Sequence, residues 1–275
     1  APAQSEVLDH LEIVGRGLPL AKMPLPFIAI PTTAGTGAEA TRNAVIGVPA
    51  SGRKVSLRDD RMFARIAVVD PGLTDHCPRN VTLSSGMDAL TQVIEPFVSC
   101  KATPFTDAVT RPAISAGVTA LVRLMQSEDP ASRDQMAWVS LCGGLALSNA
   151  GLGAVHGLAG VIGGLTGAGH GAICGALLGP VLQMNARLVV KGSDADLRLT
   201  EVRSMLAAAF AVKPDQAAGA LASWARSAGL PKVTELGLAP AQFESVAQAA
   251  LLSSSMRGNP VAGSKDDLME VLASE

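Results

Sequence analysis

Four side chains in the middle of the chain have types and spacings that could form a chemical site. Asp88 and Gln92 lie four residues apart in a segment of helical period, so both fall on one face of a predicted helix. His156 and His170 lie fourteen residues apart on either side of a glycine-rich turn, so they can occupy two successive helices and converge. Imidazole and carboxylate together suit Zn²⁺ or Fe²⁺. One hypothesis is therefore a divalent-metal site.

The same residues also have a purely structural interpretation. Asp88 can be an acid in the first turns of a helix that Ser84 or Ser85 caps, where the helix dipole favours negative charge. A buried histidine is more often a hydrogen-bonded core residue than a metal ligand. Because spacing cannot show convergence, the metal site and the satisfied core both stay open at this point.

The two histidines lie in an unusually uncharged part of the chain. From Gln135 to Ala186, 52 residues contain no Asp, Glu, Lys or Arg. Glycines interrupt this stretch, so no clean run of about 20 strongly apolar residues is left for a membrane-spanning helix. We therefore interpret it as close-packed helices of a soluble domain, in which each buried polar side chain needs a partner. A metal ion or a ligand is one such partner.

The elements that must position these residues change type along the chain. Short apolar runs between turn formers predict three buried strands of an α/β sheet, at 27–30, 44–48 and 66–69. After Pro78 the pattern predicts helices at 84–99, 104–125, 131–149, 155–165, 171–190, 194–210, 214–228, 240–254 and 265–273. The predicted fold is a partial α/β domain, residues 1–78, followed by an all-helical domain, residues 79–275.

A threonine- and glycine-rich loop follows the first predicted strand, at residues 31–40. Gly35, Gly37 and Ala40 have the spacing of a dinucleotide fingerprint, but another strand signal follows where the first crossover helix should begin. The hydroxyls and backbone N–H groups of the loop could bind a phosphate or ribose, and a plain turn is the alternative. Lys54 has no further context here, which favours a solvated surface lysine.

Composition narrows the class of function. A net charge of −2 without basic clusters gives no electrostatic footprint for nucleic acid or an anionic membrane. Four widely spaced cysteines and the lack of a signal sequence at the start indicate a cytoplasmic chain with reduced thiols. Ala1 is not an initiator methionine, so we expect the natural N-terminus to be missing.

Several separated motifs, in register, resemble one family. Residues 31–39, 69–71, 86–91 and 151–157, followed by His170-Gly171, resemble the iron-containing (group III) alcohol dehydrogenases, relatives of maleylacetate reductase and of the dehydroquinate synthase-like superfamily. The resemblance implies a nucleotide-binding α/β domain, a helical domain and an active site in the cleft between them. It also implies that this chain is N-terminally incomplete and lacks the Gly-Gly-Gly-Ser loop that holds the cofactor pyrophosphate.

The resemblance assigns roles to individual residues. Asp88, His156 and His170 match catalytic metal ligands, and Gln92 occupies the position of a fourth ligand that is usually histidine. A second active-site histidine is usual at the position of Gly160. Contacts to NAD or NADP are implied for Thr32, Thr33 and Thr36 in the loop, Asn43 near the nicotinamide, Lys54 at the ribose and Leu73 packing near the cofactor. Because a glutamine carbonyl is a weaker ligand than imidazole, these departures predict weakened or altered metal binding.

The function implied by the resemblance is hydride transfer between a nicotinamide cofactor and a small alcohol or aldehyde, with Fe or Zn polarising the substrate oxygen. It also implies a homodimer or larger homo-oligomer, while the charge pattern predicts no nucleic-acid or membrane partner. A first alternative is a maleylacetate-type reductase of an unsaturated acid without metal, for which Arg257 is the candidate substrate contact. A second is a catalytically inert helical scaffold, if the chain is naturally this short.

Overall fold

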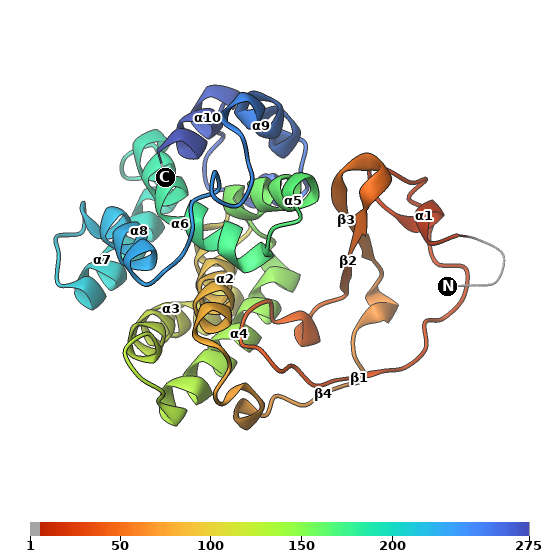
Figure 1. Cartoon of the computed structure of the whole chain (residues 1–275), viewed down its shortest axis with the longest axis horizontal. Helices are drawn as coiled ribbons and strands as arrows, with labels where there is room; N and C mark the ends of the chain where they lie inside the picture. Colours follow the sequence, from red (N-terminus) through yellow and green to blue (C-terminus); the bar gives the residue numbers. More distant parts are fainter. Residues whose placement is uncertain (1–5, 275) are drawn as a thin grey trace.

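The structure, a computed structural model, describes residues 6–274, with most helices gathered on one side and the strands on the other (Figure 1). A short helix, α1 (Val7–His10), lies beside the strands. The larger helical part contains α2 (Arg79–Val98), α3 (Pro104–Leu124), α4 (Pro130–Ala150), α5 (Ala154–Thr166), α6 (His170–Leu188), α7 (Asp194–Phe210), α8 (Ala217–Ser227), α9 (Phe243–Leu251) and α10 (Lys265–Ala273). The predicted fold class is confirmed. The division into two domains stays a prediction.

The strands differ from the prediction of one buried sheet. They are β1 (Ile28–Ala29), β2 (Asn43–Val48), β3 (Arg53–Arg58) and β4 (Ile66–Ala67). β1 pairs in parallel with β4, whereas β2 and β3 form an antiparallel hairpin. β3 was missed because charged and polar residues dominate its sequence.

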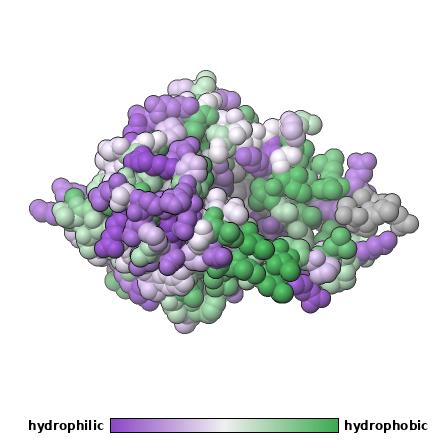
Figure 2. Space-filling view, turned by 60° about the horizontal axis from the view of Figure 1, so that its bottom comes forward, coloured by the Kyte–Doolittle hydropathy of each residue, from purple (hydrophilic) through white to green (hydrophobic). Residues whose placement is uncertain are grey.

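The prediction that these strands are buried is wrong for the described chain. Ile28 is 58% exposed and Ile66 is 54% exposed. Figure 2, in which the bottom of Figure 1 comes forward, shows an apolar patch in the region of β1 and β4. A two-stranded sheet has too few neighbours to cover its own apolar residues, so the side chains of the pair remain at the surface.

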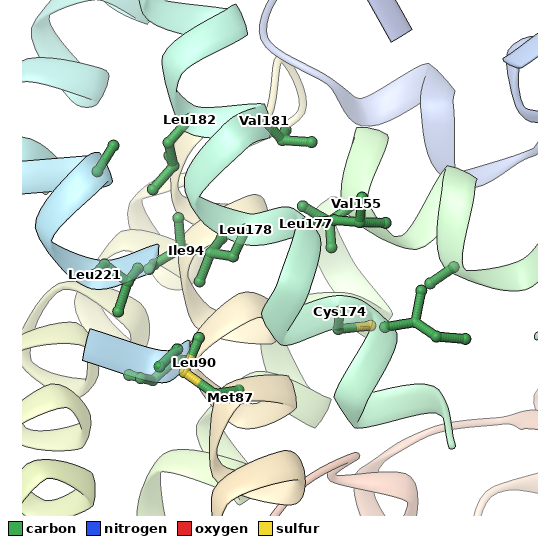
Figure 3. Close-up of a cluster of buried hydrophobic side chains, with 14 of the residues drawn as sticks. Met87, Leu90, Ile94, Val155, Cys174, Leu177, Leu178, Val181, Leu182 and Leu221 are labelled. Atoms are coloured by element: carbon green, nitrogen blue, oxygen red, sulfur yellow. The ribbon is translucent and has the colours of Figure 1, made fainter. Parts of the chain in front are cut away.

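Helix α2 is the centre of the helical part. Every residue from Gly86 to Val98 is buried, because α3, α4, α6 and α7 pack around this helix. Figure 3 shows Met87, Leu90 and Ile94 of α2 in the same apolar cluster as Leu177 and Leu178 of α6.

Glycines allow α2 and α6 to approach closely. A Cβ atom on Gly171 would lie 2.3 Å from the carbonyl oxygen of Ser84, and one on Gly175 would lie 2.8 Å from the Cβ atom of Met87. Side chains at these two positions would push the helices apart. The glycine content of the uncharged stretch therefore serves close helix packing.

No single described helix is long and apolar enough to span a membrane. Helices α4 and α5 reach that length and apolar character only when taken together, and the chain bends by 101° between them.

The threonine- and glycine-rich loop is fastened to the helical part through its glycines. The backbone N–H of Gly37 donates to Ser140 Oγ at 3.1 Å. A Cβ atom on Gly144 of α4 would lie 2.1 Å from the carbonyl oxygen of Gly37, which itself has a φ of 55°. The loop backbone is thus held directly against α4, and glycine is required on both sides of the contact.

The Gly37–Gly144 contact predicts a large difference between two glycine-to-alanine substitutions. Gly144→Ala should lower the free energy of unfolding by about 1–3 kcal/mol, because its new methyl group overlaps the loop backbone. Gly160→Ala is the matched control on α5, where an added Cβ meets nothing within 4 Å. That change should be neutral or stabilising by up to about 1 kcal/mol. Urea unfolding measures both; equal stability of the two variants would contradict the close contact.

Candidate metal and cofactor site

Three predicted ligands converge from three helices. Asp88 on α2 is 2% exposed and His156 on α5 is 7% exposed, while His170 is the first residue of α6. His156 Nε2 lies 3.4 Å from Asp88 Oδ1, and His170 Nε2 lies 3.9 Å from the same oxygen. The convergence that sequence spacing left open is therefore present in the fold. The role of these residues as ligands stays a prediction.

Cys174 joins this cluster and was not among the predicted site residues. Its Sγ atom lies 3.6 Å from His170 Nε2, and one potential ligand atom from each of Asp88, His156, His170 and Cys174 lies within 4.8 Å of the other three. His170 and Cys174 are four residues apart, a spacing that brings side chains to one face of a helix. The predicted helix began at residue 171, which left His170 outside it and hid this relation.

Gln92 has a different set of contacts from those expected of a metal ligand. Its Nε2 atom donates a hydrogen bond to the carbonyl oxygen of Gly35 at 3.2 Å, in a buried position. A Cβ atom on Gly143 would lie 3.0 Å from the Cβ atom of Gln92, so α4 packs tightly against this side chain. Gln92 therefore fastens the threonine- and glycine-rich loop to α2. Its role as a metal ligand stays a prediction.

Glu95 orients His156 and the start of α5 together. One carboxylate oxygen, Oε2, lies 2.7 Å from His156 Nδ1, and the other, Oε1, accepts from the backbone N–H of Val155 at 2.7 Å. Since a carboxylate accepts, Nδ1 carries a proton, and Nε2, which faces Asp88, is the nitrogen left to bind a metal ion once its own proton is lost. A carboxylate behind a ligating histidine is the usual arrangement of metal sites.

Gly153 makes room for this arrangement at the beginning of α5. A Cβ atom there would lie 2.9 Å from Glu95 Oε1 and 2.9 Å from Asn259 Oδ1. Asn259 Oδ1 accepts from the backbone N–H of Ala154, so two side chains satisfy the first free N–H groups of the helix. Glycine at position 153 therefore leaves room for the two side chains that accept hydrogen bonds from the N–H groups at the start of α5.

The chemistry of the donor set fits a divalent cation. Among the described residues, Asp88 Oδ1 and His156 Nε2 are buried side-chain atoms without a hydrogen-bond partner. A buried polar atom left in this state costs about 1–3 kcal/mol. Ligands about 2.0–2.3 Å from a tetrahedral ion lie roughly 3.3–3.7 Å apart, close to the 3.4 Å between these two atoms. An ion between them would satisfy both.

Protons compete for the same atoms. Burial alone would lower the pKa of His156, but electrostatic interactions with Cys174 and Glu95 outweigh it, and the pKa lies well above its usual range. Electrostatic interaction with Cys174 also raises the pKa of His170, against the effect of burial. Burial would raise the pKa of Asp88, yet the neighbouring imidazoles lower it. A cation must displace protons here, so metal affinity falls as pH falls.

The predicted cofactor residues lie in three places. Thr32, Thr33 and Thr36 are exposed, although the loop backbone between them is held against the helices. Lys54 on β3 reaches the helical part, where its Nζ lies 3.5 Å from the carbonyl oxygen of Ala168. Asn43 is the first residue of β2, and Leu73 is 46% exposed in the 3₁₀ turn Pro71–Thr74. Their contacts with a cofactor stay predictions.

The fold and the cluster together define a class of protein: a helical part in which Asp88, His156 and His170 converge, preceded by the strands of an α/β part. Two family models match the chain, "Iron-containing alcohol dehydrogenase" over residues 3–71 and "Fe-containing alcohol dehydrogenase family, C-terminal" over residues 82–275. The chain belongs to the iron-containing alcohol dehydrogenase family.

Individual relatives agree with that family. The probable alcohol dehydrogenase EutG of Escherichia coli is 34% identical over 251 residues, covering 90% of this chain and 62% of that protein. The NAD-dependent methanol dehydrogenase of Bacillus methanolicus is 32% identical, covering 91% of this chain and 66% of that protein. The structure of sulfoacetaldehyde reductase from Bifidobacterium kashiwanohense in complex with NAD⁺ has a TM-score of 0.80 at 26% identity, covering 97% of this chain and 68% of that one. The chain thus spans about two thirds of its relatives' length.

The bond from Glu95 to His156 predicts a loss of metal affinity in Glu95→Gln. If the new amide oxygen keeps the Val155 N–H, its NH₂ group faces Nδ1 and moves the imidazole proton to Nε2, the nitrogen that faces Asp88. Zn²⁺ affinity should fall about 10- to 100-fold, measured by competition with a chromophoric chelator. Glu201→Gln, which alters an exposed ion pair with Arg111, is the control and should bind Zn²⁺ normally. Wild-type affinity in Glu95→Gln would refute this role.

Proposed function

We propose that the protein is an oxidoreductase that transfers hydride between a nicotinamide cofactor and a small alcohol or aldehyde, assisted by a divalent metal. The observation that carries the proposal is a pair of buried atoms, Asp88 Oδ1 and His156 Nε2, which lie 3.4 Å apart within the described cluster and have no hydrogen-bond partner. Family membership supports the type of reaction. The names of relatives that use NAD or reduce an aldehyde support the cofactor and the substrate class.

In this proposal the helical residues hold the metal and fix its ligands. Asp88, His156 and His170 would bind the ion, which when bound supplies Lewis-acid polarisation of the alcohol or carbonyl oxygen. Glu95 keeps the proton of His156 on Nδ1, so that Nε2 is available as a ligand. The apolar side chains of α2, α5 and α6 around the cluster exclude water, and electrostatic interactions are stronger in such surroundings.

The cofactor contacts are proposed on the loop and the hairpin. Thr32, Thr33 and Thr36 offer exposed hydroxyls on a backbone that cannot move freely, which suits the binding of ribose or phosphate oxygens. Lys54 would contribute its ammonium at the ribose, from a position beside the α5–α6 connection. Both NAD and NADP remain candidates, and Asn43 and Leu73 would complete the contacts.

The family supports the proposed oligomer and substrate, and composition supports the proposed location and the absence of other partners. We propose a cytoplasmic homodimer or larger homo-oligomer that binds a small-molecule substrate, without a nucleic-acid or membrane partner. Arg257, on which the unsaturated-acid reductase depends, is exposed in the 3₁₀ turn Ser255–Gly258. No contact of its side chain within the described residues favours that alternative.

Removal of the acid tests the proposed reaction. Asp88→Asn removes a charged ligand. Bound metal and the rate of NAD(P)H oxidation with small aldehydes should both fall by more than about 100-fold, because loss of a residue that only supports a ligand already costs about 10- to 100-fold. Elemental analysis and a spectrophotometric assay on the full chain measure the two quantities. Asp215→Asn changes an exposed acid and should leave both unchanged. A wild-type chain without metal and without turnover would refute the proposal.

Lys54→Met tests the proposed ribose contact separately from the metal. Loss of a charge-assisted hydrogen bond is worth about 1.5–3 kcal/mol, so the dissociation constant of the nicotinamide cofactor should rise roughly 10- to 100-fold. Metal content should stay at the wild-type value. Lys101→Met, at an exposed lysine on the helical side, is the control. Unchanged cofactor affinity in Lys54→Met would remove Lys54 from the site.

A further inference from the structure

Cys174 has no assigned role, although it lies within the metal cluster. We propose that Cys174 Sγ is the fourth protein ligand of the metal ion, in place of Gln92, and that the resulting Asp-His-His-Cys centre favours Zn²⁺. This inference rests on the metal-assisted function proposed above. It replaces a weak amide ligand by a strong thiolate, so the unusual residue at position 92 need not cost the protein its metal.

The position of Cys174 follows from helix geometry. Cys174 is four residues after His170 on α6, so both side chains project from one helix face towards α2. Figure 3 shows Cys174 in the first turns of α6, below Leu177. Its Sγ lies 3.6 Å from His170 Nε2, within the roughly 3.3–3.7 Å expected for two ligands of one tetrahedral zinc ion.

A hydrogen bond alone explains the cluster less well than an ion. The hydrogen bond between Cys174 Sγ and His170 Nε2 leaves two other buried atoms without a hydrogen bond, in an ion-pair contact of 3.4 Å with each other. These are Asp88 Oδ1 and His156 Nε2, on side chains more than nine-tenths buried. One cation bound by all four residues would satisfy both atoms and use the thiol as well. These two atoms, which lack a hydrogen bond, therefore point to a ligand beside Cys174 Sγ.

The side chain of Gln92 already makes a hydrogen bond outside the metal cluster. Its amide donates to the carbonyl oxygen of Gly35 and thereby holds the threonine- and glycine-rich loop on α2. Turning that amide towards the ion would break the bond and release the loop. Each residue then has one role, since Gln92 fastens the loop and Cys174 binds the metal.

The choice of ion follows from the ligand. Metal binding breaks the Sγ–H bond of Cys174, the proton passes to bulk water, and an Sγ–metal bond forms with no change in oxidation state. The thiolate and the Asp88 carboxylate then supply two negative charges to the divalent ion. The Glu95 carboxylate lies at the start of α5, where it accepts a hydrogen bond from the N–H of Val155 and the helix dipole stabilises negative charge. Thiolate with imidazole favours borderline-soft Zn²⁺ over harder ions.

Cobalt substitution tests the role of Cys174 without reference to turnover. The full chain is stripped with a chelator and loaded with Co²⁺, whose spectrum shows a thiolate-to-metal charge-transfer band only when sulfur is bound. The wild type should show this band, and Cys174→Ser should lose it while still binding Co²⁺ more weakly. Zn²⁺ affinity, measured by chelator competition, should fall at least about 100-fold in Cys174→Ser. A smaller fall, of about 10- to 100-fold, is typical for a residue that supports a ligand without binding the metal itself.

Two variants make the result specific. Cys142→Ser changes another buried thiol, whose pKa burial raises to about 11, on α4 outside the cluster, and should keep the band. Gln92→Ala should keep the band too, although the loop is released. Thermal unfolding of the metal-free variants checks that each still folds.

The outcomes separate the two proposals. A wild-type chain that binds Co²⁺ without the band, or a Cys174→Ser variant that retains it, would overturn the role of Cys174 and leave the metal-assisted function standing. Loss of the Co²⁺ spectrum in Gln92→Ala with no change in Cys174→Ser would also overturn it, in favour of the amide. A wild-type chain that binds neither Co²⁺ nor Zn²⁺ would overturn both proposals.

Discussion

The candidate centre depends on one carboxylate that serves two partners. Glu95 holds the imidazole of His156 with one oxygen and the first turn of α5 with the other. The tautomer of His156 is therefore tied to the position of a helix start rather than to the rotamer of one side chain. A buried carboxylate is expensive unless its oxygens are paired, and these two N–H donors make its burial in α2 possible.

Close approach between backbones is the second requirement. Asp88 reaches His170 because Gly171 lets α6 lie on the backbone of α2, and the loop reaches α4 because Gly37 and Gly144 meet without side chains. The same small residues leave the helices few polar groups of their own.

Sequence reasoning predicted the existence of the helices after Pro78 but missed the short helix α1. Helix α2 begins at Arg79, five residues before the predicted start, so Ser84 and Ser85 are not its caps; their hydroxyls donate to the carbonyl oxygen of Val81 within the helix. The strands were harder: β3, with Arg53 and Lys54, carries charge where a strand signal needs apolar residues, and two-residue strands have no period. Asp88, His156 and His170 could be selected by type and by family motif. Cys174 and the double role of Glu95 could not, since both depend on where neighbouring helices begin and how they cross.

The burial of α2 has a dynamic consequence for the centre. Segment 86–98 is fully buried, and buried helices of this kind open only with the surrounding core, so we expect Asp88 to be held in place. His170 differs: it is the first residue of α6, and its side chain is 39% exposed. Helix ends open locally at little cost. An ion bound at this candidate centre would therefore enter and leave past His170, on the side away from the buried α2 and α5 residues.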